Sequence, residues 1–113
     1  MRFFRKERVG SLIQEELSKL LLREVEVPGA LISITEVDVT KKLDHAKVMV
    51  SVLPSEKAEV TMKQLTARAG HFQHELNHVM NIRPMPRIEF RLDIGLEKAA
   101  AIERALLKEE NKG

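Results

Sequence analysis

Residues 65–80, LTARAGHFQHELNHVM, decide the fold that the rest of the chain can adopt. Apolar residues recur there at steps of four and three: Leu65, Ala69, Phe72, Leu76, Val79 and Met80. This spacing is typical of one continuous helical stripe. The stripe keeps its phase through Gly70, although a glycine inside a helix costs about 1 kcal/mol relative to alanine. We therefore predict two short helices that meet at a kink, Ala69-Gly70.

The segments before this stretch have the patterns of one helix and two strands. Apolar residues between Val9 and Leu21 recur at three and four positions, which predicts an amphipathic helix over residues 5–23, ended by Val27-Pro28-Gly29. Residues 31–40 and 45–53 are rich in β-branched residues and are separated by a short turn, as in a hairpin. The apolar positions of the first strand change phase near Thr35-Glu36, which indicates a β-bulge.

Proline and glycine set the limits of the remaining elements. Pro54 closes the hairpin, and Ser55 is the predicted N-cap of the helix that leads into residues 65–80. The segment Arg83-Pro84-Met85-Pro86 cannot be helical. Strict alternation over residues 88–94 then predicts a strand with one buried face. Gly95 ends that strand, and residues 96–110 have the composition of a final helix that frays toward the end of the chain.

The predicted order, α-β-β-α-kink-α-β, defines the fold class. Three strands with helices on one face form a single two-layer α+β domain, and this order is the one expected of a type II KH-like domain. We assign residues 1–95 to this domain and residues 96–113 to a C-terminal helical tail, packed on the domain or fraying from it. KH domains clamp single-stranded nucleic acid with a Gly-x-x-Gly loop, but Arg68-Ala69-Gly70 stands in its place here.

Composition limits the kinds of protein that the chain can be. Its 113 residues suffice for one hydrophobic core, and the lack of cysteine leaves no disulfide or thiolate metal site. No apolar run approaches the roughly 20 residues that span a bilayer, so we expect a soluble cytoplasmic protein without a membrane partner. The net charge is only +2, but Arg2, Arg5, Lys6 and Arg8 concentrate positive charge at the N-terminus.

Several short segments, in a fixed order, resemble one known family. They are Arg8-Val9 and Glu16-Leu17 in the first helix, Ile34-Thr35-Glu36-Val37 in the first strand, Leu43, Ala46 and Val48 around the hairpin, and residues 82–93, IRPMPRIEFRLD. The last run looks like the signature Leu-Arg-x-x-Pro-x-Leu-x-Phe-x-x-Asp of ribosome-binding factor A, and the resemblance covers residues 8–93. It implies a KH-like fold with an Ala-x-Gly kink. It also implies late maturation of the small (30S) ribosomal subunit by binding 16S ribosomal RNA on free 30S subunits, with importance for growth in the cold.

Three positions depart from the residues that are usual in this family. Arg68 precedes the kink where alanine is usual, Gln73 stands where arginine is common, and Ile94-Gly95 follows the signature where serine is frequent. These departures leave the predicted fold unchanged and concern the RNA contacts around the kink.

One motif indicates a different chemistry. The run His74-Glu75-Leu76-Asn77-His78 matches H-E-x-x-H, in which two histidines one helical turn apart bind zinc and the glutamate is the general base. Glu97 lies downstream as a third ligand. The helical phase, however, places His71, His74 and His78 opposite the predicted core stripe, in solvent. We therefore favour a solvated histidine face over a zinc metallohydrolase and expect no metal, no cofactor and no catalysis.

Basic side chains in four regions are the candidate RNA contacts, because Lys and Arg neutralise phosphates. They lie in the N-terminal arm, where Phe3-Phe4 adds stacking surface, in the hairpin, at the kink and around the last strand. The candidates are Arg5, Lys6, Arg8, Lys41, Lys42, Lys47, Arg68, His71, His74, Arg83 and Arg87. The alternative for each is an exposed polar residue without a ligand, and for the arm a frayed terminus whose phenylalanines pack on the first helix.

These observations favour RNA binding without chemistry, by a monomer. Affinity would come from neutralised phosphates and fall steeply with salt, and selectivity would come from shape complementarity to a folded RNA site. The other class left open is a KH-like module that binds a protein, which predicts an exposed apolar patch and little dependence on salt.

Overall fold

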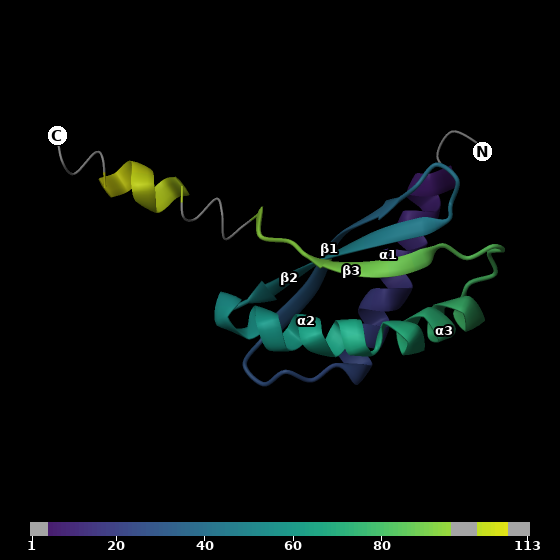
Figure 1. Ribbon diagram of the computed structural model, residues 1–113, viewed down its shortest axis with the longest axis horizontal. Helices are drawn as coiled ribbons and strands as arrows, with labels where there is room; N and C mark the ends of the chain where they lie inside the picture. Colours follow the sequence, from purple (N-terminus) through teal and green to yellow (C-terminus); the bar gives the residue numbers. More distant parts are fainter. Residues whose placement is uncertain (1–4, 96–101, 109–113) are drawn as a thin grey trace.

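A three-stranded sheet and three helices form two layers in the computed structural model, which describes residues 5–95 and 102–108 (Figure 1). The elements are α1 (Arg5–Glu24), β1 (Leu31–Val39), β2 (His45–Leu53), the 3-10 turn η2 (Ser55–Lys57), α2 (Ala58–Ala67), α3 (Ala69–Val79) and β3 (Arg87–Leu92). The predicted α+β class and element order are confirmed. Residues 102–108 are helical, and the rest of the predicted tail lies outside the described residues.

The sheet has the order β1-β2-β3 and is mixed. β1 and β2 are antiparallel, as the predicted hairpin requires, and their register shifts between Ile34 and Glu36, which confirms a bulge at Thr35. β3 pairs with β2 in parallel, from His45 opposite Arg87 to Val50 opposite Leu92. Because the two strands are parallel, β3 begins at the same end of the sheet as the β1–β2 turn.

The core lies between the helices and one face of the sheet. Alternate residues of β2 (Ala46, Val48, Val50 and Val52) and of β3 (Ile88 and Phe90) are buried, as their pattern predicted, against the stripe of α1 and the kinked pair. In α3, Phe72 and Leu76 are fully buried, but Val79 is 56% exposed. The prediction for Val79 was wrong because α3 ends there, and Met80 occupies the buried position instead.

The junction of α2 and α3 lies one residue before the predicted kink. α2 ends at Ala67 and α3 begins at Ala69, and Arg68 between them leaves the helical backbone conformation with φ −105° and ψ 10°. The two helices run end to end along the sheet (Figure 1). At Gly70, an added Cβ would meet no atom within 4 Å, so the structure uses neither a close approach nor a left-handed backbone at this glycine.

The start of α2 also differs from the sequence prediction. Residues 55–57 form a 3-10 turn that begins after Pro54, and α2 follows only at Ala58. Lys57 therefore occupies the N-cap position of α2, and Pro54 occupies that of η2. Neither residue makes a side-chain capping hydrogen bond. The prediction of Ser55 as N-cap was wrong because the tight turn places it inside η2.

Two glutamines connect the helices to the outer strands. Gln14 of α1 donates from Nε2 to the carbonyl of Ile34 at 2.9 Å, beside the bulge. Gln73 of α3 donates to the carbonyl of Pro86 at 3.0 Å and accepts from the N–H of Ile88 at 2.8 Å. The side-chain amide of Gln73 thus pairs with the edge of β3 as a neighbouring strand would.

The chain after β3 is held against β1. The Thr35 hydroxyl donates to Oδ2 of Asp93 at 2.7 Å, and the N–H of Gly95 donates to Oδ1 at 2.9 Å. These two hydrogen bonds, that from Thr35 first, lower the pKa of Asp93. The bulge therefore places the Thr35 hydroxyl where it can donate to the carboxylate of Asp93, the residue that follows β3. Within the described residues, none of the helices has the length and apolar content that a bilayer crossing requires.

A close approach of helix and sheet occurs at Gly10 of α1. A Cβ built on this residue would lie 2.9 Å from the carbonyl oxygen of Val37 and 3.4 Å from Cγ2 of Val39. The first distance is shorter than a van der Waals contact, and its partner is backbone. Only glycine lets α1 pack this closely on β1.

The two glycines predict opposite effects of the same substitution. We expect Gly10→Ala to destabilise the domain by about 1–3 kcal/mol, because α1 must move away from β1. We expect Gly70→Ala to raise stability by up to about 1 kcal/mol, because the site is open and alanine is the better helix former. Urea unfolding of both variants measures the difference, and equal effects would contradict this account of the helix packing.

Candidate nucleic-acid interface

Three parts of the chain meet at one end of the domain (Figure 1). The contact of Gly10 with Val37 and Val39 places the start of α1 beside the end of β1. The N–H of Arg87 donates to the carbonyl of Asp44 at 2.9 Å, which joins the start of β3 to the β1–β2 turn. We call this the basic end, because it gathers predicted contacts that are far apart in sequence: Arg5, Lys6, Arg8, Lys41, Lys42, Arg83 and Arg87.

Three arginines of the basic end surround one groove. The arginine groove, of about 580 Å³, lies between α1 and the α3–β3 loop and is lined by Arg5, Arg8, Val9, Leu12, Asn81, Ile82 and Arg83. Its lining combines guanidinium groups and an amide with apolar side chains. Among residues 5–95 and 102–108, no carboxylate lies within ion-pair distance of any of these arginines. The groove therefore presents positive charge that a phosphate can neutralise.

The β1–β2 turn is held rigidly beside this groove. The Thr40 hydroxyl donates to Oδ1 of Asp44 and accepts from the N–H groups of Asp44 and His45, each at 3.2 Å. The hydrogen bond from Thr40 is the main cause of the lowered pKa of Asp44. Leu43 adopts a left-handed backbone with φ +59°. This network fixes the turn so that both of its lysines, Lys41 and Lys42, are exposed.

Acidic residues reduce the charge of some neighbouring candidates. Glu7 and Asp44 belong to the same end of the molecule as the arginine groove. Lys47 lies farther along β2, on the open face of the sheet, with Asp38 opposite it on β1 and Glu89 opposite it on β3. Lys47 is thus exposed but flanked by two carboxylates.

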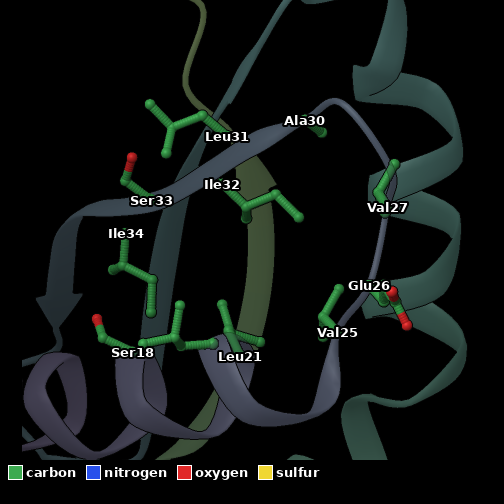
Figure 2. Close-up of a pocket in the computed structure, with 11 residues that line it drawn as sticks. Ser18, Leu21, Val25, Glu26, Val27, Ala30, Leu31, Ile32, Ser33 and Ile34 are labelled. Carbon is green, nitrogen blue, oxygen red and sulfur yellow. The ribbon is translucent and has the colours of Figure 1, made fainter.

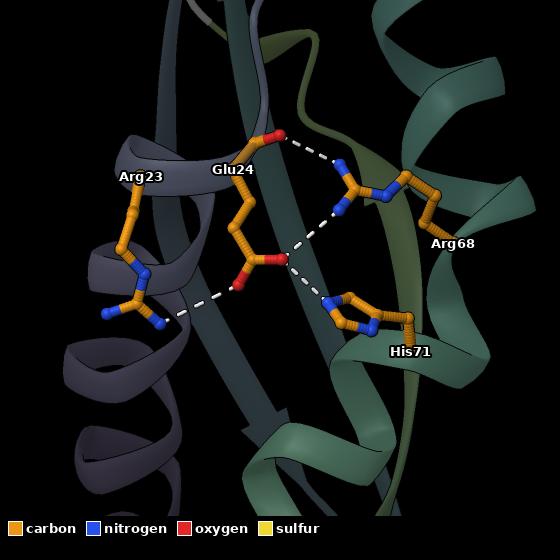
Figure 3. A network of polar contacts seen from close by, with 4 residues as sticks. All are labelled: Arg23, Glu24, Arg68 and His71. Atoms are coloured by element: carbon orange, nitrogen blue, oxygen red, sulfur yellow. Dashed lines mark hydrogen bonds and ion pairs between the residues drawn. The ribbon is translucent and has the colours of Figure 1, made fainter.

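The predicted contacts at the kink form a separate cluster (Figure 3). Arg68 donates from Nη1 to the carbonyl of Glu24 at 2.8 Å and from Nη2 to Oε1 of Glu24 at 3.2 Å. Nε2 of His71 lies 2.6 Å from the same Oε1, and Arg23 approaches Oε2 at 3.6 Å. The guanidinium of Arg68 also lies 5.0 Å from the ring centroid of Phe72. The hydrogen bond from His71 is the main cause of the lowered pKa of Glu24.

The structure therefore divides the predicted site into two. Arg68 and His71 meet the last residue of α1, whereas Arg5 is its first residue, and a helix of this length separates them by about 28 Å. Their polar atoms already bind Glu24, so part of their charge is satisfied inside the domain. They do not belong to the same surface as the arginine groove.

His71, His74 and His78 of α3 are all exposed, as predicted. The rings of His74 and His78 have centroids 5.1 Å apart, and His71 also reaches Glu24 of α1. In the described part of the chain, no three His, Cys, Asp or Glu side chains are grouped as metal ligands. Glu97, the third ligand considered, lies outside it.

The sequence predicted Arg5, Arg8 and Arg83, but Leu12 and Asn81 of the groove and Glu24 at the kink were not predicted. Arg5, Arg8 and Leu12 have the spacing i, i+3, i+7 of one helix face, and this spacing could have predicted the wall that α1 contributes. Glu24 is an acidic residue at a helix C-terminus, where the helix dipole disfavours negative charge. That unfavourable placement was the available signal for a cationic partner. No local pattern indicated Asn81 or the role of Gln73.

Comparisons with known proteins give a consistent result. The family model described as ribosome-binding factor A matches residues 5–106. The ribosome-binding factor A of Caldanaerobacter subterraneus subsp. tengcongensis is 38% identical over 112 residues, covering 96% of this chain and 91% of that protein. The one from Dictyoglomus thermophilum is 42% identical over 105 residues, covering 90% and 88%. The crystal structure of ribosome-binding factor A from Thermus thermophilus is similar in fold, with a TM-score of 0.66 and 20% identity over 77% of this chain and 93% of that one.

The Glu24 cluster predicts a specific loss of stability in acid. Because the folded-state pKa of Glu24 is lowered, its ionised form stabilises the domain fully above the unfolded pKa of about 4.3. This contribution is lost as the pH falls through the lower folded-state pKa. We therefore expect the Glu24→Gln variant to lose less stability than the unaltered protein between about pH 5 and pH 3.

Urea midpoints measured across this pH range test the expectation. Glu15→Gln is the matched control, because Glu15 is an exposed carboxylate on the same helix, in a surface ion pair with Lys19. The control should follow the acid dependence of the unaltered protein. If Glu24→Gln did the same, the Glu24 cluster would not contribute to stability in the way that its contacts indicate.

Proposed function

The chain belongs to the ribosome-binding factor A family, and from this premise we propose that it binds the small (30S) ribosomal subunit through 16S ribosomal RNA during late maturation. The observation that supports this proposal most is the arginine groove. Two segments distant in sequence place Arg5, Arg8 and Arg83 around one cavity, with no intramolecular carboxylate within ion-pair distance among the described residues.

The proposed contact is made by phosphates rather than by bases. Guanidinium groups bind phosphate oxygens in a bidentate way, and the exposed Lys41 and Lys42 of the rigid turn extend the positive surface beyond the groove. The lining of the groove includes the apolar Leu12 and Ile82 but no aromatic side chain. Recognition would therefore depend on the shape of a folded RNA site and on its phosphate positions.

The kink has a structural part in this proposal. Arg68 and His71 join α3 to the end of α1 through Glu24, which fixes the layer that carries the α3–β3 loop and Arg83. Arg68 and His71 remain predicted RNA contacts only through those N–H groups that do not bind Glu24. His74 and Lys47 are exposed and are secondary predicted contacts, because they lie outside the arginine groove.

Binding in this way needs no covalent step, so we propose an assembly factor rather than an enzyme. A monomer occupying the immature RNA would hold it in one arrangement and exclude later ligands until the subunit is ready. This place in assembly implies a cytoplasmic protein whose absence matters most in the cold, when misfolded RNA escapes slowly from its trapped states.

Charge reversal in the arginine groove tests the proposal directly. We expect Arg8→Glu combined with Arg83→Glu to weaken binding to purified 30S subunits by on the order of tenfold or more at low salt, because two phosphate contacts become repulsive. The slope of log affinity against log salt should decrease by about two. Sedimentation with 30S subunits over a salt series measures both quantities.

The matched control is Lys57→Glu combined with Lys63→Glu, which makes the same change of charge near α2, away from the basic end. We expect this control to bind nearly as the unaltered protein does, and circular dichroism to show both variants folded. Equal weakening by the two pairs would indicate attraction by net charge alone. Binding that is indifferent to salt and to both pairs would favour a protein contact instead and overturn the proposal.

A further inference from the structure

The end of the domain opposite the arginines carries an apolar groove (Figure 2). This groove, of about 510 Å³, lies between the last turns of α1 and the start of β1, and its walls include Leu21, Leu22, Val25, Val27, Ile32 and Ile34. Figure 2 shows the side chains of Leu21, Val25, Ile32 and Ile34 directed into the space between helix and strand. Leu22 on its rim is 89% exposed. Exposed apolar walls of this kind gain free energy when a ligand covers them.

The groove also lies at the edge of the sheet. β1 is an outer strand, and the carbonyl of Ile34 faces α1, where Gln14 binds it. Because backbone groups alternate along a strand, those of Ile32 point the same way, toward the groove. The other outer strand, β3, has its first backbone groups paired with Gln73. Proteins commonly cover such an edge with a helix.

The chain itself contains a helix whose apolar side chains are largely exposed. In the helix at residues 102–108, Ile102 is 56% exposed, Leu106 55% and Leu107 58%. Ile102 and Leu106 are one helical turn apart and therefore share a face. This helix lies away from the two-layer domain in Figure 1.

The path of the chain brings this helix within reach of the groove. The hydrogen bond between Thr35 and Asp93 holds the end of β3 beside β1, one residue from Ile34 of the groove. The six residues 96–101 can span at most about 20 Å, which exceeds the roughly 10 Å of two strand spacings that separate β3 from β1. A helix of seven residues is about 10 Å long, and the stretch from Ala30 to Ile34 is about 16 Å long, so the helix fits along it.

A second apolar surface lies on α2 and is lined by Ala58, Met62 and Ala67, with Glu59 and Lys63 at its rim. It offers the helix a competing position.

We propose that the helix at residues 102–108 docks in the apolar groove, with Ile102 and Leu106 against Leu22 and Ile32, and covers the outer edge of β1. This inference does not depend on RNA binding, because the groove and the basic end lie at opposite ends of α1.

Cysteine cross-linking tests the docked form, since the chain has no cysteine of its own. We expect the Leu22→Cys/Leu106→Cys variant to form an intramolecular disulfide under mild oxidation about tenfold faster than two control pairs, because docking raises the effective concentration of its thiols. One control, Leu22→Cys/Glu103→Cys, moves the thiol off the apolar face of the helix. The other, Lys63→Cys/Leu106→Cys, probes the surface of α2. Equal rates for the three pairs, faster closure onto α2, or disulfides mainly between two copies would each overturn the proposal.

Thermal unfolding gives a second, independent measurement. If the helix docks, Leu22→Ser and Leu106→Ser should each lower the Tm by about 2–4 °C, and the double variant should fall little further than the lower single one, because both changes remove the same contact. The undocked form predicts no loss from either change, since both side chains would remain in water. Unchanged Tm values in folded variants would therefore contradict docking.

Discussion

The parallel pairing of β3 with β2 is the constraint on which the rest of this structure depends. An antiparallel β3 would begin at the far end of the sheet. A parallel one must begin beside the β1–β2 turn, so α2 and α3 carry the chain back along the sheet before β3 can start. The α3–β3 loop, with Arg83, therefore arrives at the end where α1 also begins. The convergence of basic residues is thus a consequence of topology, which explains why residues 75 positions apart line one groove.

The helices fix this arrangement through two kinds of contact. Gly10 lets α1 lie directly on the backbone of β1, and Glu24 at the other end of α1 holds the junction of α2 and α3 through Arg68 and His71. The guanidinium of Arg68 satisfies a helix C-terminal carbonyl and a carboxylate together. This residue, predicted from the sequence as an RNA contact, thus contributes to packing inside the domain.

The sequence predicted those features that depend on local periodicity. Alternation in β2 and β3, the stripe of α1 and the phase change at Thr35 each indicate which side chains face the core, and the structure confirms most of these positions. The exceptions are Leu12 of α1, which is exposed, and Ile94, which is exposed because β3 ends at Leu92. The errors at Ser55 and Val79 have a common cause, because both depend on where a helix begins or ends. Glu24 contacts Arg68 and His71, which lie 44 and 47 positions away in the sequence. No local sequence pattern predicts these contacts.

The two grooves differ in chemistry because they lie at opposite ends of the same helix. The first turns of α1 carry arginines around a polar opening, whereas its last turns carry leucines beside an outer strand. Phosphate binding at one end is screened by salt over about 8–10 Å, which is much shorter than the helix, so charge alone cannot connect the two sites. Any coupling between them would have to move α1 relative to β1. The close packing at Gly10 and the contacts of Glu24 with Arg68 and His71 oppose that movement. We therefore expect RNA binding and coverage of the apolar groove to be independent.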